Sequence, residues 1–162
     1  MSRTKTPAES AIETRYILAP HQVNSFGTAF GGVIMSWIDM VAAMAAQRHC
    51  QGVVVTASID KISFKAPIHV GDHVVLKASV NYVGTTSMEV GVRVNKEDPV
   101  TGEEVRTTTA YLTFVQLDRE GMPKKVTALD PQSKDEKRRY ENAKQRVQAR
   151  KDLRVKLKKI DT

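Results

Sequence analysis

The chain has 162 residues, of which 41% are hydrophobic and 27% charged, and it contains a single cysteine. This size and composition predict one globular domain with a real core, and the lone cysteine excludes an internal disulfide and favours a reducing, cytoplasmic location. No apolar run reaches the length of a membrane span, and the first ten residues lack the apolar core of a signal peptide, so no contact with a membrane is expected.

The net charge of +7 is confined to one end of the chain. Residues 131–162 hold twelve Lys or Arg and five Asp or Glu, whereas residues 1–130 hold thirteen of each and are neutral. A charge confined to one segment is most simply a solvated helix face. We therefore divide the chain into a disordered N-terminus (1–11), a globular domain (12–130) and a basic, helical C-terminal extension (131–162).

The first predicted strand covers residues 13–18, and a glycine-spaced loop (21–32) then leads into a strongly apolar segment (33–50). An apolar character on nearly every face predicts a buried helix. In the middle of this helix lies one carboxylate, Asp39, whose burial is costly unless something satisfies it.

After Gly52 the hydrophobic pattern changes to a period of two. We expect a long strand over residues 53–67 and further strands over 73–83, 87–95 and 105–117. The last three are joined by short turns, so they are expected to pair as an antiparallel meander. One helix followed by several strands predicts an α+β fold, with a single sheet of about five strands wrapped around the long central helix.

The C-terminal extension contains a capping box, in which Ser133 is the N-cap residue and Glu136 occupies the third helical position. A thin apolar stripe of Leu153, Leu157 and Ile160 follows at helical spacing. We expect a helix that lies on the domain surface or on a neighbouring subunit.

Several kinds of chemistry find no support in the sequence. The chain has no Gly-x-Ser-x-Gly motif, no Walker loop and no complete dinucleotide fingerprint. His69 and His73 are four residues apart, but Gly71 in a turn separates them, so they are not a helical metal-binding pair. His49 and Cys50 are adjacent, yet no third group is evident to orient a nucleophilic pair.

The remaining candidates are Asn24, Gly31, Gly32 and Asp39. The N-terminus of a helix carries unpaired N–H donors, which suit a developing oxyanion, and glycines there allow another group to approach closely. Asp39 lies eight residues after Gly31, which is about 12 Å along a helix axis. This spacing is long for one reaction centre, and it predicts that a second chain completes the site.

Each candidate also has a purely structural explanation. A glycine pair before a helix is often a site of tight packing, and a buried aspartate is often a hub for hydrogen bonds. Asn24 alone is most simply a loop or cap residue. The residues by themselves leave these alternatives open.

The spacing of these residues resembles that of a known family. The pattern is Asn24-x-x-Gly27-x-x-Phe30-Gly31-Gly32-x-x-Met35-x-x-x-Asp39. It is similar to that of hot-dog-fold acyl-CoA thioesterases, and most of all to the cytosolic acyl-CoA hydrolase family of bacteria and mammalian brain. The resemblance covers about residues 12–125. Many members have a histidine where this chain has Phe30.

This resemblance implies a hot-dog fold and hydrolysis of fatty acyl-CoA to free CoA and a carboxylic acid, with no cofactor beyond the CoA of the substrate. Two chains would pair edge to edge and assemble further into trimers of dimers. Asp39 of one chain would act as general base, with the partner's Asn24 positioning water or substrate. The backbone N–H of Gly32, with Gly31 beside it, would stabilise the oxyanion.

The phosphates of CoA require cationic or hydroxyl partners. The candidates on the strands and in the hairpin are Lys61, Lys65, Thr85, Thr86, Ser87 and Arg93.

Two other functions are considered. One is a non-catalytic acyl-CoA-binding regulator of the same fold, whose basic extension contacts nucleic acid; the sequence has no room for a helix-turn-helix before residue 12, so nucleic acid is not the expected partner. The other is a hot-dog dehydratase, for which no His–acid pair is evident.

Overall fold

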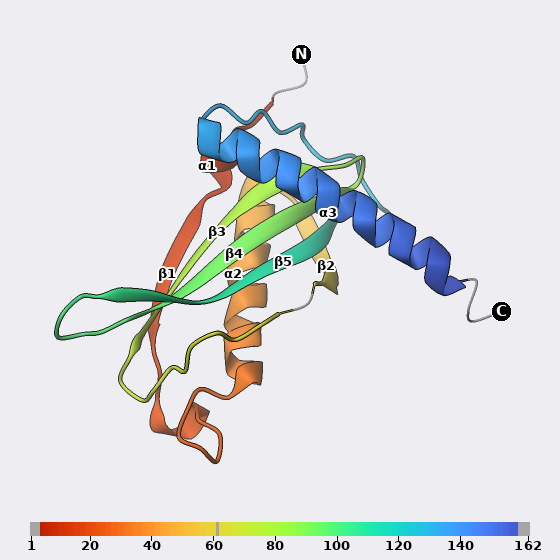
Figure 1. The fold of residues 1–162 in the computed structure, drawn as a ribbon. Coiled ribbons are helices and arrows are strands. Elements are labelled where there is room, and N and C mark those ends of the chain that lie inside the picture. Colours follow the sequence, from red (N-terminus) through yellow and green to blue (C-terminus); the bar gives the residue numbers. More distant parts are fainter. Residues whose placement is uncertain (1–3, 61, 159–162) are drawn as a thin grey trace.

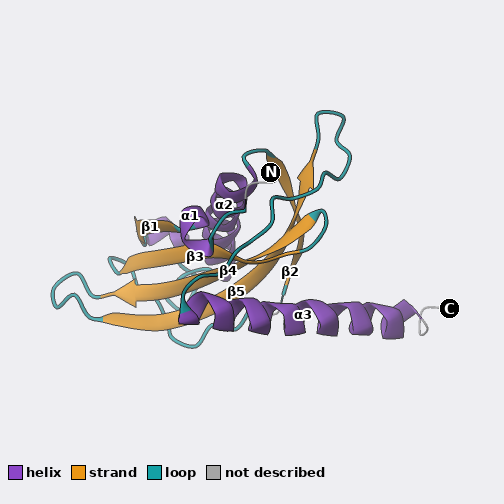
Figure 2. Cartoon of the chain, turned by 90° about the horizontal axis from the view of Figure 1, so that it is seen from above, coloured by secondary structure: helices purple, strands orange, loops and turns teal. Residues whose placement is uncertain are grey.

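A computed structural model describes residues 4–60 and 62–158 and shows an antiparallel sheet with a long helix on each face (Figures 1 and 2). The five strands lie in the order β1-β3-β4-β5-β2. The elements are α1 (Pro7–Ser10), β1 (Ile12–Ile17), a 3₁₀ turn (Pro20–Gln22), α2 (Gly31–Cys50), β2 (Val53–Ile59), β3 (His73–Val83), β4 (Ser87–Glu97), β5 (Glu104–Leu117) and α3 (Lys134–Lys158). The predicted α+β hot-dog arrangement is confirmed. Among the described residues, no helix has the length and hydrophobicity that crossing a membrane requires.

The meander of β3, β4 and β5 forms as the alternating pattern predicts. Val80 pairs with Val90, and Val90 pairs with Leu112, so the apolar residues of all three strands share one face. That face packs against α2, whose residues Ile38 and Val41 are fully buried. The meander therefore forms the sheet face against which α2 packs.

The predicted strand over residues 53–67 is too long. Strand β2 ends at Ile59, after a bulge between Thr56 and Ser58 that shifts its register on β5. A bulge bends a strand away from its neighbour. After Ile59, the described backbone meets β5 where Asp60 N donates to Tyr111 O and Lys65 N donates to Thr107 O, each at 2.9 Å, and where Ser63 O accepts Thr108 Oγ1 at 3.5 Å.

The composition of α2 predicted a helix that is buried on all sides, but within one chain one side of it is exposed. The side chains of Met35, Met40 and Met44 are 41%, 48% and 41% exposed. Asp39 is half-buried among them, beside the exposed edge strand β2. Apolar composition indicates that a surface will be covered, but it does not say whether the same chain covers it.

The C-terminus of α2 is capped by a distant residue. Lys5 Nζ donates to Arg48 O at 3.0 Å and to His49 O at 2.8 Å, where a cation is favoured by the helix dipole. This contact and helix α1 both fall in the stretch 1–11, which the sequence predicted to be disordered. Helix α1 is closed by a reciprocal capping box between Thr6 and Glu9.

His49 lies fully buried at this end of α2, and its Nε2 is 2.8 Å from Thr127 O. Burial lowers the pKa of His49 below its usual value of 6.5. The hydrogen bond with Thr127 O opposes this in part, and the charge of Lys5 adds a smaller lowering effect. Below pH 6.5, His49 therefore binds a proton more readily in the unfolded chain than in the folded chain. We expect the free energy of unfolding to fall as the pH drops from 6.5, by at most about 1.4 kcal/mol per pH unit from this group.

Urea unfolding at pH 7 and pH 5.5 measures this effect. In a His49→Gln variant the loss of stability between the two values should be smaller than in the parent chain. The exposed His21 provides the control, because His21→Gln should keep the parental pH dependence. Equal pH dependence in the His49→Gln variant and the parent would contradict the assignment.

Helix α3 lies across the outer face of the sheet and extends past its β2 edge (Figures 1 and 2). Its predicted capping box is confirmed, since Glu136 N donates to Ser133 Oγ at 3.2 Å and Ser133 N donates to Glu136 Oε2 at 2.9 Å. Its anchor on the sheet is Glu89 of β4, which is 1% exposed. Glu89 accepts hydrogen bonds from Arg146 Nη2 at 2.7 Å and Arg150 Nη2 at 2.9 Å. Part of the basic charge of the extension is therefore neutralised within the chain.

Replacing Glu89 with glutamine should release α3 from the sheet, because two partly buried guanidinium groups would lose their counter-charge. We expect a loss of about 3 kcal/mol in the free energy of unfolding. Limited proteolysis at the basic residues of α3 should become faster at the same time. Glu141→Gln, an exposed change on the same helix, should alter neither measurement. If Glu89→Gln matches that control, α3 is held by other contacts.

Candidate active site

Asp39 of α2 meets Thr56 of β2 on the exposed side of the molecule. Thr56 Oγ1 donates to Asp39 Oδ1 at 2.8 Å. Thr56 was not among the candidates that the sequence singled out, because its place beside Asp39 depends on how β2 runs back along α2. Helix α2 advances about 1.5 Å per residue and β2 returns beside it at about 3.3 Å per residue, so Thr56, the fourth residue of β2, lies level with Asp39 near the middle of the helix.

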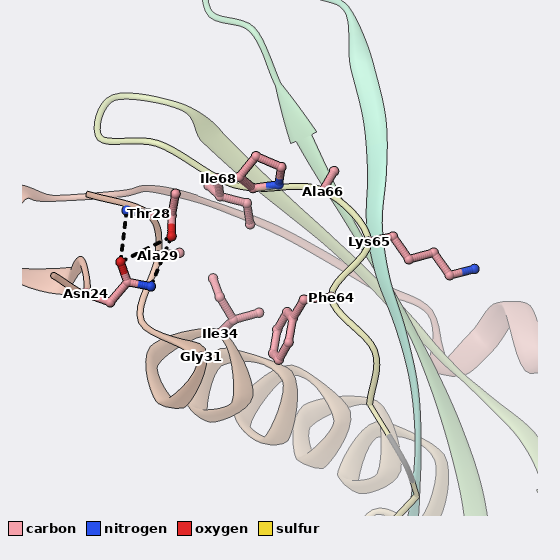
Figure 3. Close-up of a pocket in the computed structure, with 10 residues that line it drawn as sticks. Asn24, Thr28, Ala29, Gly31, Ile34, Phe64, Lys65, Ala66 and Ile68 are labelled. Carbon is pink, nitrogen blue, oxygen red and sulfur yellow. Dashed lines mark hydrogen bonds between the residues drawn. The ribbon is translucent and has the colours of Figure 1, made fainter. Parts of the chain in front are cut away.

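Asn24 organises the glycine-spaced loop before α2 (Figure 3). Its Oδ1 accepts the backbone N–H of Phe26 at 2.9 Å and of Thr28 at 3.3 Å, and its Nδ2 donates to Thr28 Oγ1 at 3.0 Å. Gly27 within this loop has a φ of 75°, a left-handed conformation that favours glycine. The structural role considered for Asn24 is therefore present, and it fixes the loop directly before the helix.

The N-terminus of α2 offers donors to an incoming group. Phe30 O accepts the N–H of Val33 at 3.0 Å and of Ile34 at 3.5 Å. Within the described residues, the N–H groups of Gly31 and Gly32 have no acceptor, as expected for the first turn of a helix. A Cβ on Gly32 would lie 2.5 Å from the Phe30 ring, so a larger residue there would require this exposed ring to turn aside.

A pocket of about 360 Å³ opens beside this helix end (Figure 3). It brings Asn24 and Gly31 together, and the side chains of Ile34 and Phe64 project toward each other across it (Figure 3). Asp39 and Gly32 are not part of its lining. Within one chain the candidate residues thus form two separate groups: Asn24 with the glycine turn, and Asp39 with Thr56.

The predicted CoA contacts are divided between different surfaces. Lys65 and Arg93 both line a groove on the outer face of the sheet, and the Lys65 side chain points away from the pocket beside α2 (Figure 3). The hairpin residues Thr85, Thr86 and Ser87 do not line that groove; their backbone carbonyls accept hydrogen bonds from Val126, Gln116 and Gly84. Lys61 lies outside the described residues.

His49 and Cys50 lie at the opposite end of α2 from the glycine turn. The Cys50 Sγ lies 3.8 Å from Gly52 O, and burial raises the pKa of its thiol. A buried, protonated thiol is a poor nucleophile. Among the described residues, no three His, Cys, Asp or Glu side chains cluster in a way that could hold a metal ion.

Comparison with known proteins places the chain in a family. Residues 26–103 match the Thioesterase superfamily. The uncharacterized acyl-CoA thioester hydrolase YkhA of Bacillus subtilis is 41% identical over 149 residues, which are 92% of this chain and 87% of that protein. The chain belongs to the acyl-CoA thioester hydrolases of the thioesterase superfamily.

Solved thioesterases share its fold over almost the whole length. The acyl-CoA hydrolase of Staphylococcus aureus, solved with butyryl coenzyme A and coenzyme A, is 39% identical and superposes with a TM-score of 0.91 over 97% of this chain and 96% of that one. Variants of that enzyme, each with alanine in place of one asparagine, aspartate or threonine, have also been solved. A hexameric acyl-CoA thioesterase is 40% identical, with a TM-score of 0.90 over 93% of this chain and 97% of that one.

Proposed function

We propose that this chain hydrolyses fatty acyl-CoA thioesters, with Asp39 as the general base in a site that two copies build together. The observation that carries the proposal is the hydrogen bond between Thr56 and Asp39 on an exposed edge, where the described part of the chain offers no further partner for the carboxylate. Family membership supports the reaction class.

The proposed chemistry needs only water and the side chains present. Thr56 donates to Asp39 Oδ1 and fixes the carboxylate, which leaves Oδ2 to accept a proton from water. The oxygen of that water attacks the thioester carbonyl, and the N–H of Gly32 stabilises the oxyanion. The C–S bond then breaks, the CoA thiolate takes up the proton, and a carboxylic acid is released. No cofactor other than the CoA of the substrate enters this scheme.

Pairing through β2 would bring these two groups of residues together in one site. β2 is an edge strand with exposed Val53, Val55 and Ile59, and the exposed methionines of α2 lie beside it. An open apolar edge of this kind favours pairing with another strand. We infer that β2 pairs antiparallel with its copy, so that Asp39 of one chain faces the partner's Asn24 and Gly32, and that such dimers assemble into hexamers as in the hexameric relative.

The replaced residues of the S. aureus enzyme support the same set. Their positions in that chain are fifteen residues apart from asparagine to aspartate and seventeen apart from aspartate to threonine. Asn24, Asp39 and Thr56 have the same two spacings here. We therefore add Thr56 to the proposed site as the residue that positions the base. With one cysteine, we place this activity in the cytoplasm.

A thiol-release assay over straight-chain acyl-CoAs of graded length tests the reaction. We expect steady release of free CoA thiol, equal in amount to the carboxylic acid formed, with a preferred chain length. Acyl-CoA incubated without protein gives the rate of spontaneous hydrolysis. Rates no higher than this at every chain length would reject the proposed function.

Thr56→Val should lower kcat about 10- to 100-fold, because the carboxylate would lose the bond that fixes its orientation. KM should change little, since Thr56 is not proposed to touch CoA. Thr56→Ser keeps the hydroxyl and should restore most of the rate, whereas Ser58→Ala on the same strand should behave as the parent. A fully active Thr56→Val chain would remove Thr56 from the site.

A further inference from the structure

The end of strand β2 is in contact with a helix on each face of the sheet. Thr56 Oγ1 donates to Asp39 of α2 at 2.8 Å. Asp60, the residue directly after the strand, accepts a hydrogen bond from Arg150 Nη1 of α3 at 2.6 Å. Helix α3 lies on the sheet face opposite to α2 (Figure 2). The end of β2 therefore connects the proposed catalytic pair with the C-terminal extension.

The bulge in β2 decides which helix each of these side chains meets. Residues four apart on a regular strand point to the same face, so Thr56 and Asp60 would both face α2. The register on β5 shifts directly after Thr56, and the extra residue reverses the alternation. Thr56 pairs with Phe114, whose side chain lies in the core with α2. Asp60 N instead donates to Tyr111 O, and the centroid of the Tyr111 ring is 3.6 Å from Arg146 Cζ of α3. The bulge thus presents Asp60 to α3.

Arg150 bridges two carboxylates that come from different strands. Its Nη1 binds Asp60, and its Nη2 donates to Glu89 Oε2 of β4 at 2.9 Å. The side chain of Glu89 is 1% exposed, and those of Arg150 and Asp60 are 25% and 23% exposed. A planar guanidinium group holds two acceptors in a fixed geometry, and charged hydrogen bonds are the strong ones. Because β4 is the central strand of the sheet, Arg150 ties the end of the edge strand to the centre.

The end of β2 depends on this tie because its other support is limited. In the described sheet β2 is an edge strand, and β5 is its one neighbour. The bulge interrupts the pairing with β5 directly after Thr56. The end of a strand with few contacts opens locally at a small cost in free energy. Such opening would begin near Asp60 and would move the Thr56 hydroxyl away from Asp39.

We propose that Asp60 and Arg150 are positioning residues for the hydrolysis, a role that rests on the proposed function of Asp39 and Thr56. Together they hold the end of β2, and through it they keep the Thr56 hydroxyl where it orients the Asp39 carboxylate. Neither residue touches the substrate or the attacking water. The C-terminal extension therefore supports the rate of the reaction from the opposite face of the sheet.

A double-mutant cycle in the thiol-release assay tests the proposal. Asp60→Ala should lower kcat about three- to tenfold and leave KM within about twofold of the parent, because it disturbs the orientation of the base and not the contacts of the substrate. In a Thr56→Val background the same substitution should lower kcat no further, since the hydroxyl that it positions is already absent. Arg150→Gln should reproduce both results. Asp152→Ala and Arg154→Gln remove the same charges from exposed positions on α3 and should leave kcat unchanged.

Hydrogen exchange measures the same link without turnover. Arg150→Gln leaves the sequence of β2 unchanged, so a change in exchange there reports its structure. The Asp60 amide, which donates to Tyr111 O, should exchange about tenfold faster in this variant than in the parent, whereas Arg154→Gln should keep the parental rate.

Two results would overturn the proposal. One is an Asp60 amide that exchanges equally fast in the Arg150→Gln variant and the parent. The other is an equal loss of kcat from Asp60→Ala in the parent and in the Thr56→Val background, which is what a merely structural role predicts. A parent chain that releases no thiol would instead reject the proposed function, and this is seen before any variant is compared.

Discussion

Asp39→Asn is expected to reduce kcat for acyl-CoA hydrolysis by about 10³-fold, the typical contribution of a positioned general base. Asparagine keeps the size of the side chain, and its Oδ1 still accepts the Thr56 hydroxyl. What it lacks is the second carboxylate oxygen that takes the proton from water. KM should stay within a few-fold of the parent, because the substitution removes a step of the reaction and not a contact with the substrate.

Steady-state kinetics, CoA binding and thermal unfolding together decide this prediction. The Asp39→Asn chain should bind CoA and unfold like the parent, so that the loss is confined to kcat. Glu103→Gln, an exposed change in the turn before β5, removes the same charge and should keep full activity. A large increase in KM with kcat retained would instead make Asp39 a residue that binds substrate.

The parts of the fold that could be predicted are those specified by short-range pattern. The alternation along residues 73–83 and 87–95 defined two neighbouring strands, because a period of two places every second side chain on one face. The capping box of Ser133 and Glu136 marked the start of α3, because both partners lie within one turn. The apolar segment over residues 33–50 likewise predicted α2, which begins two residues earlier, at Gly31.

Contacts between distant residues were not accessible in the same way. Lys5 caps a helix that ends more than forty residues later, and nothing around Lys5 in the sequence points to Arg48 or His49. The bulge in β2 depends on its pairing with β5, which a pattern of single residues does not encode. Thr56 could be placed beside Asp39 only once β2 was known to run back along α2.

The exposed methionines of α2 illustrate a third limit. The sequence indicated correctly that this helix face is apolar, but the inference that its own sheet covers it was wrong. An apolar surface favours burial by any suitable neighbour, including a second copy of the chain. Asp39 lies on the same surface, so a second chain that covers the methionines would also lie beside the proposed general base.

Mixed dimers separate a shared site from one built within a chain. Asn24→Ala and Asp39→Asn chains should each be inactive alone. When the two are unfolded together and refolded at equal amounts, half of the dimers are mixed, and each mixed dimer regains one complete site of two. We expect about one quarter of the parental specific activity. A site within one chain would show no recovery, because neither chain carries both residues.

The reciprocal mixture provides the control. Chains that carry both substitutions, refolded with an equal amount of parent chain, should lower activity to about one quarter of a fully parental sample if sites are shared, because every mixed dimer then lacks a residue in each site. Sites within one chain would keep about one half. Circular dichroism must show that the Asn24→Ala chain is folded, since Asn24 also holds its own loop. Recovery to one quarter in the first mixture and a fall to one quarter in the second would assign Asp39 and Asn24 to different chains of one site.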